Sequence, residues 1–336
     1  MNTIKRAKSK ILLLFILICS ILLVNTAYAS DNDTVYSVTD DNFDTIQSLI
    51  DNATSGDSIY LEDITYNGNG SAVSINKDIT IYGSNSTILN ANNKSGIFTI
   101  SKGVDVNFIG LTLINGNAFN GDGGAIYNLG TLTINNSVIS NNSANCGAIY
   151  CDSSSSLTIY NSLFDSNRAT GGAGCIDNYK GDLKIINSTF SNNIGHEGGC
   201  IYNKYANFLV YDSTFINNSA TRGGGVYNNK GLMKIYNSKF YSNFASHLGG
   251  GIKSFGDCEV HDSIVKNNTA YQGGGLFVSQ NTMKVFNCTV EDNVAYEGGG
   301  FFADVKGTLI IKETSIKNNT ATTDGGGINV YQGYLT

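Results

Sequence analysis

A pattern of about 25 residues recurs through most of the chain and limits it to a repeat architecture. One copy runs over residues 198–220: two glycines, a short apolar stretch, alternating apolar residues, and then Phe-x-x-Asn-x-Ala. Self-similarity at a fixed period of this length is the signature of solenoids and related folds. The phenylalanine position returns every 25 or 26 residues and is held by Leu113, Ile139, Phe164, Phe190, Phe215, Phe240, Val265, Val290 and Ile316.

The length of the repeat predicts an all-β, right-handed parallel β-helix, a solenoid of ~25-residue coils. Leu157 and Ile159 alternate with Thr158 and Tyr160, which places the two aliphatic side chains on one face of a strand. Three short strands and three turns fill such a repeat and leave no room for a helix of ten residues. A leucine-rich repeat has a similar period. Its convex arm is rich in leucine, whereas the corresponding segments here carry glycines, as at Gly223–Gly225.

Two further columns of the repeat are predicted to be structural. We expect the asparagine side chains to hydrogen-bond from coil to coil and their backbone to adopt the left-handed turn conformation. The asparagine column is Asn142, Asn167, Asn193, Asn218, Asn243, Asn268, Asn293 and Asn319, and the small-residue column is Ala118, Ala144, Ala169, Gly195, Ala220, Ala245, Ala270, Ala295 and Ala321.

The N-terminal region divides into a signal peptide and a cap. Residues 1–29 have a basic start, an apolar run and Ala27-Tyr28-Ala29 at the cleavage position. The apolar run is shorter than a membrane span, so we expect membrane attachment only if this segment is left uncleaved. Residues 30–58 form a linker and a short capping helix, with Asp41 as its N-cap. The β-helix then occupies residues 59–336 and ends within a coil.

The charge composition excludes a nucleic-acid-binding surface. Charged residues make up 14% of the chain and the net charge is −6. Removal of the four basic residues of the signal peptide takes the net charge to about −10. The sequence has no basic patch for nucleic acid or for a membrane surface. We therefore expect an exported protein, extracellular or on the cell surface.

Six cysteines follow the signal peptide. Cys175 and Cys200 hold the same repeat position, so they should lie about 4.8 Å apart on neighbouring strands, within disulfide range. Stacked, unbonded thiols are the alternative. No cysteine or histidine spacing matches a zinc site, and we expect no metal or cofactor.

The repeats resemble two known families. Gly123-Gly124-Ala125-Ile126 and Phe-x-x-Asn at residues 164–167 are similar to the repeats of polymorphic outer membrane proteins. Together with Ile79–Gly83 and Gly110-Leu111-Thr112, they resemble adhesin-like surface proteins of methanogenic archaea. The resemblance covers residues 30–336. It implies an exported, right-handed parallel β-helix with a role in attachment, and it implies the fold more strongly than the function.

Parallel β-helices also serve as carbohydrate-active enzymes, which need acidic residues clustered with basic ones on one face. The best candidate cluster is Glu197 and Arg222 on neighbouring coils, with His196 beside them. The competing interpretation is a surface ion pair between coils. We expect this second interpretation to hold.

Aromatic residues predicted to point outward form a more promising surface. Flat rows of exposed rings suit stacking on sugar rings or contact with another protein. Alternatively, the rings stabilise adjacent strands or lie beneath loops. The first row is Tyr127, Tyr150, Tyr202, Tyr227, Phe277 and Phe302, and a second is Tyr160, Tyr211, Tyr236 and Phe286.

The sequence thus favours an adhesin-like surface protein that acts by extended contact, with surface glycans or the surface proteins of other cells as partners. The alternative is a polysaccharide lyase, hydrolase or epimerase on the same fold. A convergent acid–base pair in a groove would favour the enzyme. A smooth side covered by aromatic and amide groups would favour adhesion.

Overall fold

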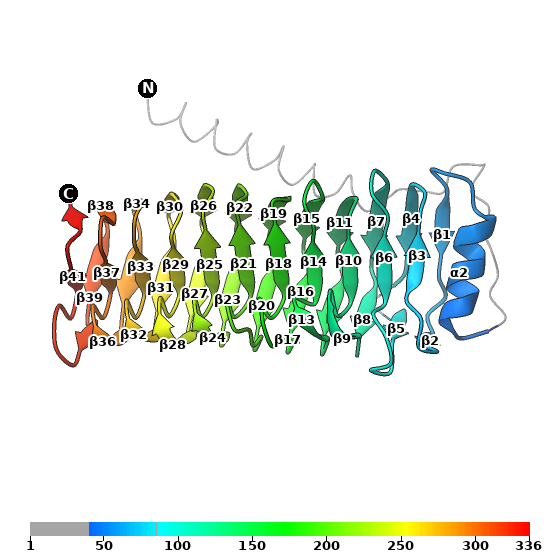
Figure 1. Ribbon diagram of the computed structural model, residues 1–336, viewed down its shortest axis with the longest axis horizontal. Coiled ribbons are helices and arrows are strands. Elements are labelled where there is room, and N and C mark those ends of the chain that lie inside the picture. The colour runs from blue at the N-terminus through cyan, green and yellow to red at the C-terminus, as the bar shows by residue number, and fades with distance from the viewer. Residues whose placement is uncertain (1–39, 85) are drawn as a thin grey trace, which may run out of the picture. The chain divides into compact units, whose positions relative to one another are not determined.

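The computed structural model describes residues 40–84 and 86–336, which form a single stack of coils (Figure 1). Each coil passes through three sheets in turn, and every strand pairs in parallel with its counterparts in the coils before and after. This arrangement confirms the predicted parallel β-helix. The predicted signal peptide and the start of the predicted linker lie outside the described residues.

Sheet 1 has twelve strands, one from each successive coil. Its first six strands are β1 (Ser58–Tyr60), β4 (Ile79–Tyr82), β7 (Asp105–Ile109), β11 (Thr131–Asn135), β15 (Ser156–Tyr160) and β19 (Asp182–Ile186). The other six are β22 (Phe208–Tyr211), β26 (Met233–Tyr236), β30 (Cys258–His261), β34 (Thr282–Phe286), β38 (Thr308–Lys312) and β42 (Tyr334–Leu335).

Sheet 2 carries the phenylalanine position of the repeat and has eleven strands. They are β2 (Thr65–Asn67), β5 (Ile88–Asn90), β8 (Thr112–Ile114), β12 (Val138–Ser140), β16 (Leu163–Asp165), β20 (Thr189–Ser191), β23 (Thr214–Ile216), β27 (Lys239–Tyr241), β31 (Ile264–Lys266), β35 (Thr289–Glu291) and β39 (Ser315–Lys317).

Sheet 3 follows the glycine-rich turns and also has eleven strands. They are β3 (Val73–Ile75), β6 (Phe98–Ile100), β10 (Ile126–Asn128), β14 (Ile149–Cys151), β18 (Ile176–Tyr179), β21 (Ile201–Lys204), β25 (Val226–Asn229), β29 (Ile252–Ser254), β33 (Leu276–Val278), β37 (Phe301–Ala303) and β41 (Ile328–Val330).

Short strands between sheets 2 and 3 pair separately in two groups. A three-stranded group contains β9 (Asn117–Asp122), β13 (Ser143–Cys146) and β17 (Arg168–Ala169). Five further strands form sheet 4: β24 (Ser219–Arg222), β28 (Phe244–Leu248), β32 (Thr269–Gln272), β36 (Val294–Glu297) and β40 (Thr320–Ala321).

The interior is filled by ladders of identical positions, as the repeat predicts. Phe164, Phe190, Phe215 and Phe240 are fully buried, and their rings stack at centroid distances of 4.8, 5.0 and 4.7 Å. Each side chain therefore packs against its own counterpart in the next coil. This repetition of one contact stabilises the whole stack.

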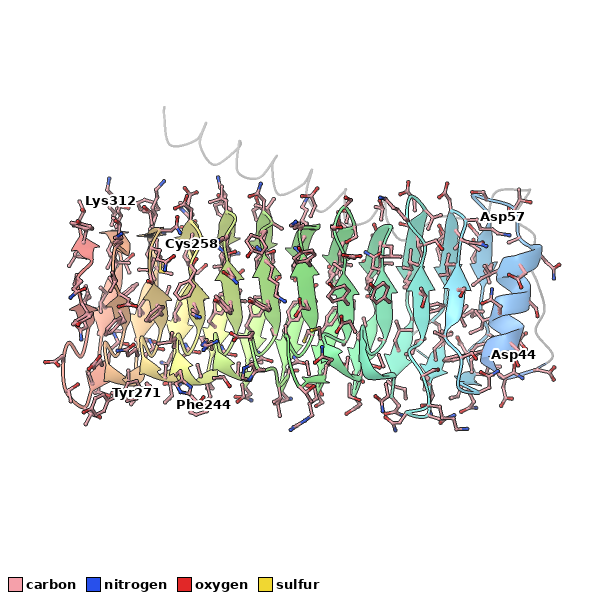
Figure 2. The ribbon with its side chains drawn as sticks, in the orientation of Figure 1. Asp44, Asp57, Phe244, Cys258, Tyr271 and Lys312 are labelled. Carbon is pink, nitrogen blue, oxygen red and sulfur yellow. The ribbon has the colours of Figure 1, made fainter. Side chains whose placement is uncertain are left out.

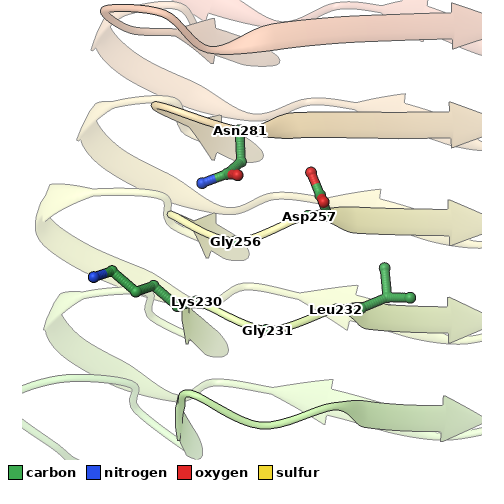
Figure 3. Close-up of a pocket in the computed structure, with 6 residues that line it drawn as sticks. All are labelled: Lys230, Gly231, Leu232, Gly256, Asp257 and Asn281. Atoms are coloured by element: carbon green, nitrogen blue, oxygen red, sulfur yellow. The ribbon is translucent and has the colours of Figure 1, made fainter.

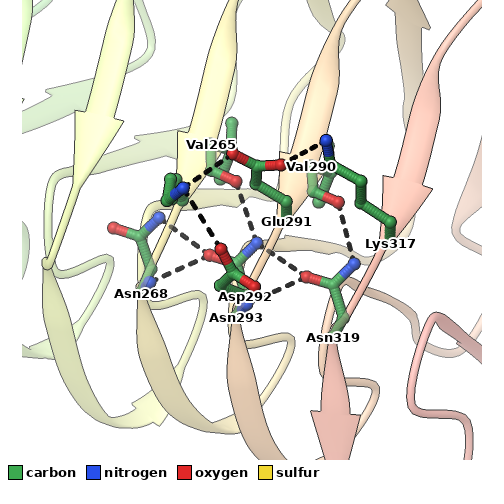
Figure 4. A network of polar contacts seen from close by, with 9 residues as sticks. Val265, Asn268, Val290, Glu291, Asp292, Asn293, Lys317 and Asn319 are labelled. Carbon is green, nitrogen blue, oxygen red and sulfur yellow. Dashed lines mark hydrogen bonds and ion pairs between the residues drawn. The ribbon is translucent and has the colours of Figure 1, made fainter.

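The asparagine column forms a buried chain of amide hydrogen bonds. Asn293 Nδ2 donates to Val265 O in the preceding coil and to Asn319 Oδ1 in the next, both at 2.9 Å (Figure 4). Its Oδ1 accepts from the backbone and side-chain nitrogens of Asn268. The predicted coil-to-coil bonding is therefore confirmed. Glu291 lies on the outer side of the same coils and bridges Lys266 and Lys317, at 2.8 Å from each.

One detail of the asparagine prediction is wrong: the left-handed conformation belongs to the residue before the ladder. Asn217 has φ 57° and Asn267 has φ 57°, whereas Asn218 and Asn268 do not have positive φ. The reason is that the ladder residue must direct its amide inward, so the preceding exposed residue makes the turn. A second column of turn residues, which includes Asp212, also adopts the left-handed conformation; Asp212 has φ 51°.

Glycines before sheet 3 let neighbouring coils approach closely. Gly198 has φ 78°, which side chains disfavour. A Cβ on Gly199 would lie 1.9 Å from Gly224 O in the next coil. The paired glycines therefore fix both the turn and the coil spacing.

Helix α2 (Phe43–Asn52) covers the first coil (Figure 1). Its apolar face is buried, and Gln47 exchanges hydrogen bonds with the backbone of Ser74 in β3. The predicted capping helix is confirmed. Its N-cap, however, is Asn42 and not Asp41: Asn42 has extended backbone angles, and its Oδ1 accepts from Thr45 N at 3.0 Å.

Candidate functional site

The predicted catalytic cluster is an ion pair between neighbouring coils. Arg222 Nη1 donates to Glu197 Oε1, and His196 Nε2 lies 3.9 Å from the same oxygen. The Arg222 side chain is 45% exposed, so solvent screens the pair. An exposed pair of this kind contributes about 0–1 kcal/mol. The structure brings the three residues together around one carboxylate, which matches the predicted surface ion pair.

The first predicted aromatic row runs along the outer side of sheet 3, but half of it is buried. Tyr227, Phe277 and Phe302 are 4%, 0% and 1% exposed, while Tyr127, Tyr150 and Tyr202 are partly exposed. The prediction of an exposed ladder is therefore wrong for the three C-terminal members. Their side chains do point away from the interior core, as the strand alternation required.

Two neighbouring segments cover the buried end of this row. The left-handed glycine turns fold back on it: a Cβ on Gly223 would lie 2.8 Å from the Cβ of Tyr227. On the other side the Phe255 ring lies 5.9 Å from the Tyr227 ring and 6.3 Å from the Phe277 ring. A second, smaller apolar layer thus forms outside the coil. Burial raises the pKa of the Tyr227 hydroxyl.

The same row contains two charged residues that the sequence analysis missed. Asp177 pairs in register with Tyr150 and Tyr202, and Lys253 with Tyr227 and Phe277. Both are almost completely buried, at 0% and 1% exposure. The signal was present in the sequence, because each residue occupies the aromatic position of its repeat.

Asp177 has one basic neighbour and no hydrogen bond to its carboxylate oxygens among the described residues. Lys204 Nζ lies 3.5 Å from Asp177 Oδ1 and also 4.3 Å from the centroid of the Tyr202 ring. Burial raises the pKa of the Asp177 carboxyl, and the attraction of Lys204 opposes that rise. The pair joins neighbouring coils, with the Asp177 side chain buried and the Lys204 side chain 26% exposed.

Lys253 is held by aromatic rings. Its Nζ lies 3.7 Å from the centroid of Tyr227 and 4.2 Å from that of Phe255. Burial lowers the pKa of Lys253 to about 7. Contact with two ring faces offsets part of the cost of burying the charged form.

The second predicted aromatic row, on sheet 1, does point outward. Its predicted members Tyr160, Tyr211, Tyr236 and Phe286 are partly exposed. His261, which the sequence analysis did not include, lies between Tyr236 and Phe286, and the ring centroids from Tyr211 to Phe286 are 5.0, 4.9 and 5.0 Å apart. The Tyr211 and Tyr236 rings are within 9° of parallel. These two rings cover each other's faces. A binding partner would therefore contact their edges and hydroxyl groups.

Sheet 4, which the sequence analysis did not single out, also carries large exposed apolar side chains. Phe244 and Tyr271 are each 47% exposed, Val294 is 46% exposed and Tyr296 is 39% exposed. Figure 2 shows Phe244 and Tyr271 along one edge of the stack. These positions flank the alanine column, so their spacing could have revealed them.

A shallow polar depression lies at the turns between sheets 3 and 1 (Figure 3). Much of its polar lining is already used within the protein. Asp257 Oδ1 accepts from Thr282 N at 3.1 Å, and Asn281 Nδ2 donates to Phe255 O at 2.6 Å. The lining residues are Lys230, Gly231, Leu232, Gly256, Asp257 and Asn281.

Cys175 and Cys200 lie in neighbouring coils as predicted, and both are free and buried. Cys175 N donates to Cys200 O at 3.0 Å, so the two backbones are directly paired. Burial raises the pKa of the Cys175 thiol. Across residues 40–84 and 86–336, no group of three His, Cys, Asp or Glu side chains is placed to hold a metal ion.

The architecture defines a parallel β-helix, and the comparisons with known proteins give its family. The family model described as "Right handed beta helix region" matches residues 147–321, and the chain belongs to this family. A second model, the Chlamydia polymorphic membrane protein repeat, matches residues 313–331. This match agrees with the repeat resemblance found in the sequence.

Among solved structures, the chain is similar to PfbA, a surface adhesin of Streptococcus pneumoniae. The two share 14% identity with a TM-score of 0.34, over 90% of this chain and 91% of PfbA. No curated protein matches. In the part of the chain that the structure describes, no helix is long and apolar enough to span a membrane.

Proposed function

We propose that this protein is an adhesin-like β-helix of the cell surface that acts by extended contact, with glycans as its partners. The observation that supports the proposal is that the outer faces carry accessible aromatic side chains. Sheets 1 and 4 present partly exposed and exposed aromatic side chains from consecutive coils. The match to a polymorphic membrane protein repeat supports placement at a surface.

Export rests on the predicted signal peptide, residues 1–29. We expect the mature chain to begin at Ser30. N-terminal sequencing of the protein recovered from the cell surface or the medium tests this point. Recovery of the full-length chain from the cytoplasm alone would contradict it.

The contact function is tested with residues 30–336 on a glycan array, followed by analysis of the same glycans for cleavage. Binding without turnover supports adhesion. Turnover would instead favour the carbohydrate-active enzyme, and Glu197, Arg222 and His196 would be the first residues to replace. Binding to no glycan would contradict the proposal.

A further inference from the structure

The outward row of sheet 4 nearest to sheet 2 alternates between hydroxyl-bearing and large apolar side chains. In this row Phe244 pairs in register with Ser219 and Thr269, and Val294 pairs with Thr269 and Thr320. Phe244 is 47% exposed and Val294 is 46% exposed. An exposed apolar surface of this kind is a candidate for burial against another group.

Each hydroxyl in the row completes an Asn-x-Ser/Thr sequence. The asparagine stands two residues earlier, in an exposed turn between sheets 2 and 4 that has the left-handed conformation. Asn-x-Ser/Thr is the acceptor sequence for N-linked glycans when it lies in a surface loop of an exported protein. These turns meet that structural condition. The three acceptors are Asn217, Asn267 and Asn318, with φ 57°, 57° and 55°.

These three acceptors occur in every second coil. The equivalent position of the two intervening coils holds Ser242 and Asp292, which also have positive φ but carry no amide. Because neighbouring coils are about 4.8 Å apart, consecutive acceptors are separated by roughly 10 Å, and their glycans would not compete for the same space. The two coils without an acceptor are the ones that supply Phe244 and Val294.

The side-chain amides of these three acceptors are free: no described residue forms a hydrogen bond with them. Two further acceptors, Asn187 and Asn287, lie in the exposed turn between sheets 1 and 2. There Asn187 Nδ2 donates to Asn161 Oδ1 in the preceding coil at 2.7 Å. Asn287 Nδ2 likewise donates to Asp262 Oδ1 at 2.6 Å. A glycan on either nitrogen would crowd the group that accepts this bond, so geometry distinguishes two sets of acceptors that have the same sequence signal.

We propose that Asn217, Asn267 and Asn318 carry N-linked glycans whose first sugars lie over the apolar side chains of this row. The donor is a lipid-linked oligosaccharide. The bond between the sugar C1 and the lipid phosphate breaks, a bond between the asparagine Nδ2 and C1 forms, the lipid phosphate leaves, and the amide nitrogen loses one proton.

The position of the apolar side chains suits this covering. Phe244 lies between the coils of Asn217 and Asn267, and Val294 lies between those of Asn267 and Asn318. The C–H face of a sugar ring packs on such a side chain while its hydroxyl groups stay in water, as other amphipathic groups do. Each apolar side chain thus has an acceptor in both neighbouring coils.

This inference rests on export of the chain, which the proposed function also requires. The test is mass spectrometry of glycopeptides from the full chain, recovered from the surface or medium of its source cells. We expect glycans at Asn217, Asn267 and Asn318, and unmodified Asn187 and Asn287. Glycans at none of the five, or equal occupancy of the two sets, would overturn the assignment. If N-terminal sequencing then shows an exported chain, the proposed function stands, whereas a full-length chain found only in the cytoplasm would overturn both.

Hydroxyl-radical footprinting of the protein from the same cells tests the covering. The variant Asn217→Gly/Asn267→Gly removes the acceptors on both sides of Phe244, and glycine accepts the positive φ at both positions. The matched control is Asn187→Gly/Asn287→Gly, which changes the same residue type at φ 47° and 51°. Circular dichroism establishes that each variant is folded. We expect Phe244 to be oxidised faster in the first variant than in the wild type and the control, and an equal rate in all three would overturn the covering of the row.

Discussion

The Nζ of Lys253 lies 3.7 Å from the ring centroid of Tyr227, which precedes it by one coil in the outward row of sheet 3. A lysine here interrupts a row of aromatic side chains. It is 1% exposed, and its Nζ also lies 4.2 Å from the centroid of the Phe255 ring. The amine is therefore held in an apolar setting, where its charged form is costly.

Lys253→Met is accordingly expected to stabilise the protein. Methionine fills a similar volume without a charge, and such replacements of buried charge are often stabilising by about 1–4 kcal/mol. Thermal and denaturant unfolding measure the change. The matched control is Lys230→Met, an exposed lysine 5.3 Å from the Tyr205 ring, which we expect to change stability by less than about 0.5 kcal/mol. Destabilisation of Lys253→Met beyond the control would indicate that the ring contacts outweigh the burial cost.

The pH dependence of the free energy of unfolding should report the ionisation of Lys253. Burial lowers the pKa of Lys253 from 10.5 to about 7 in the folded state. Between these values the unfolded chain binds a proton that the folded chain has lost, so stability rises with pH. Below pH 7 both states are protonated and the contribution is flat. Unfolding measured from pH 7 to 9 should show a rise for the wild type that is smaller in Lys253→Met, and parallel curves would contradict the assignment.

The sequence predicted the fold because the fold is periodic. The positions of Phe215 and Asn218 could be assigned without a structure, since every coil repeats the same interior contact. The outer surface could not be assigned in this way. Whether an outward residue such as Phe277 is exposed depends on turns that fold over it, and these turns vary from coil to coil. Strand alternation gives the direction of a side chain but not what covers it.

For the same reason, the sequence analysis expected exposed aromatic side chains in the wrong column of the repeat. Tyr227 looked equivalent to any outward aromatic residue, whereas Phe255 covers it. Tyr271 and Tyr296 fall in short strands next to the alanine column, and their side chains are 47% and 39% exposed. The exposure of these residues was therefore established by the three-dimensional structure, although each of them occupies a regular position of the repeat.

Thiol labelling should distinguish the two predicted states of Cys175 and Cys200. Both are free and fully buried, and burial raises the pKa of Cys175. Buried thiols with a raised pKa are inert because the thiolate is the reactive form. Iodoacetamide at pH 8 should leave both unlabelled in the folded protein and label both in guanidinium without reductant. Failure to label them in guanidinium until reductant is added would establish a disulfide.

Adjacent asparagines at positions 217 and 218 offer a direct test of what stabilises the coils. Asn218 is buried: its Nδ2 donates to Phe190 O and Asn243 Oδ1, and its Oδ1 accepts from the backbone and side chain of Asn193. Asn217 is exposed, with φ 57°. Asn218→Ala removes both donated bonds and leaves buried groups unpaired, at a cost of about 1–3 kcal/mol for each such group.

Asn217→Gly keeps a residue that accepts the left-handed conformation, so it should change stability by less than about 1 kcal/mol. Denaturant unfolding of the two variants gives the comparison. We expect Asn218→Ala to lose several kcal/mol while Asn217→Gly stays near the wild type. Equal losses would mean that the turn, and not the amide ladder, holds the coils together. The ladder repeats in coil after coil, so a large loss at this one position would identify it as the main polar support of the stack.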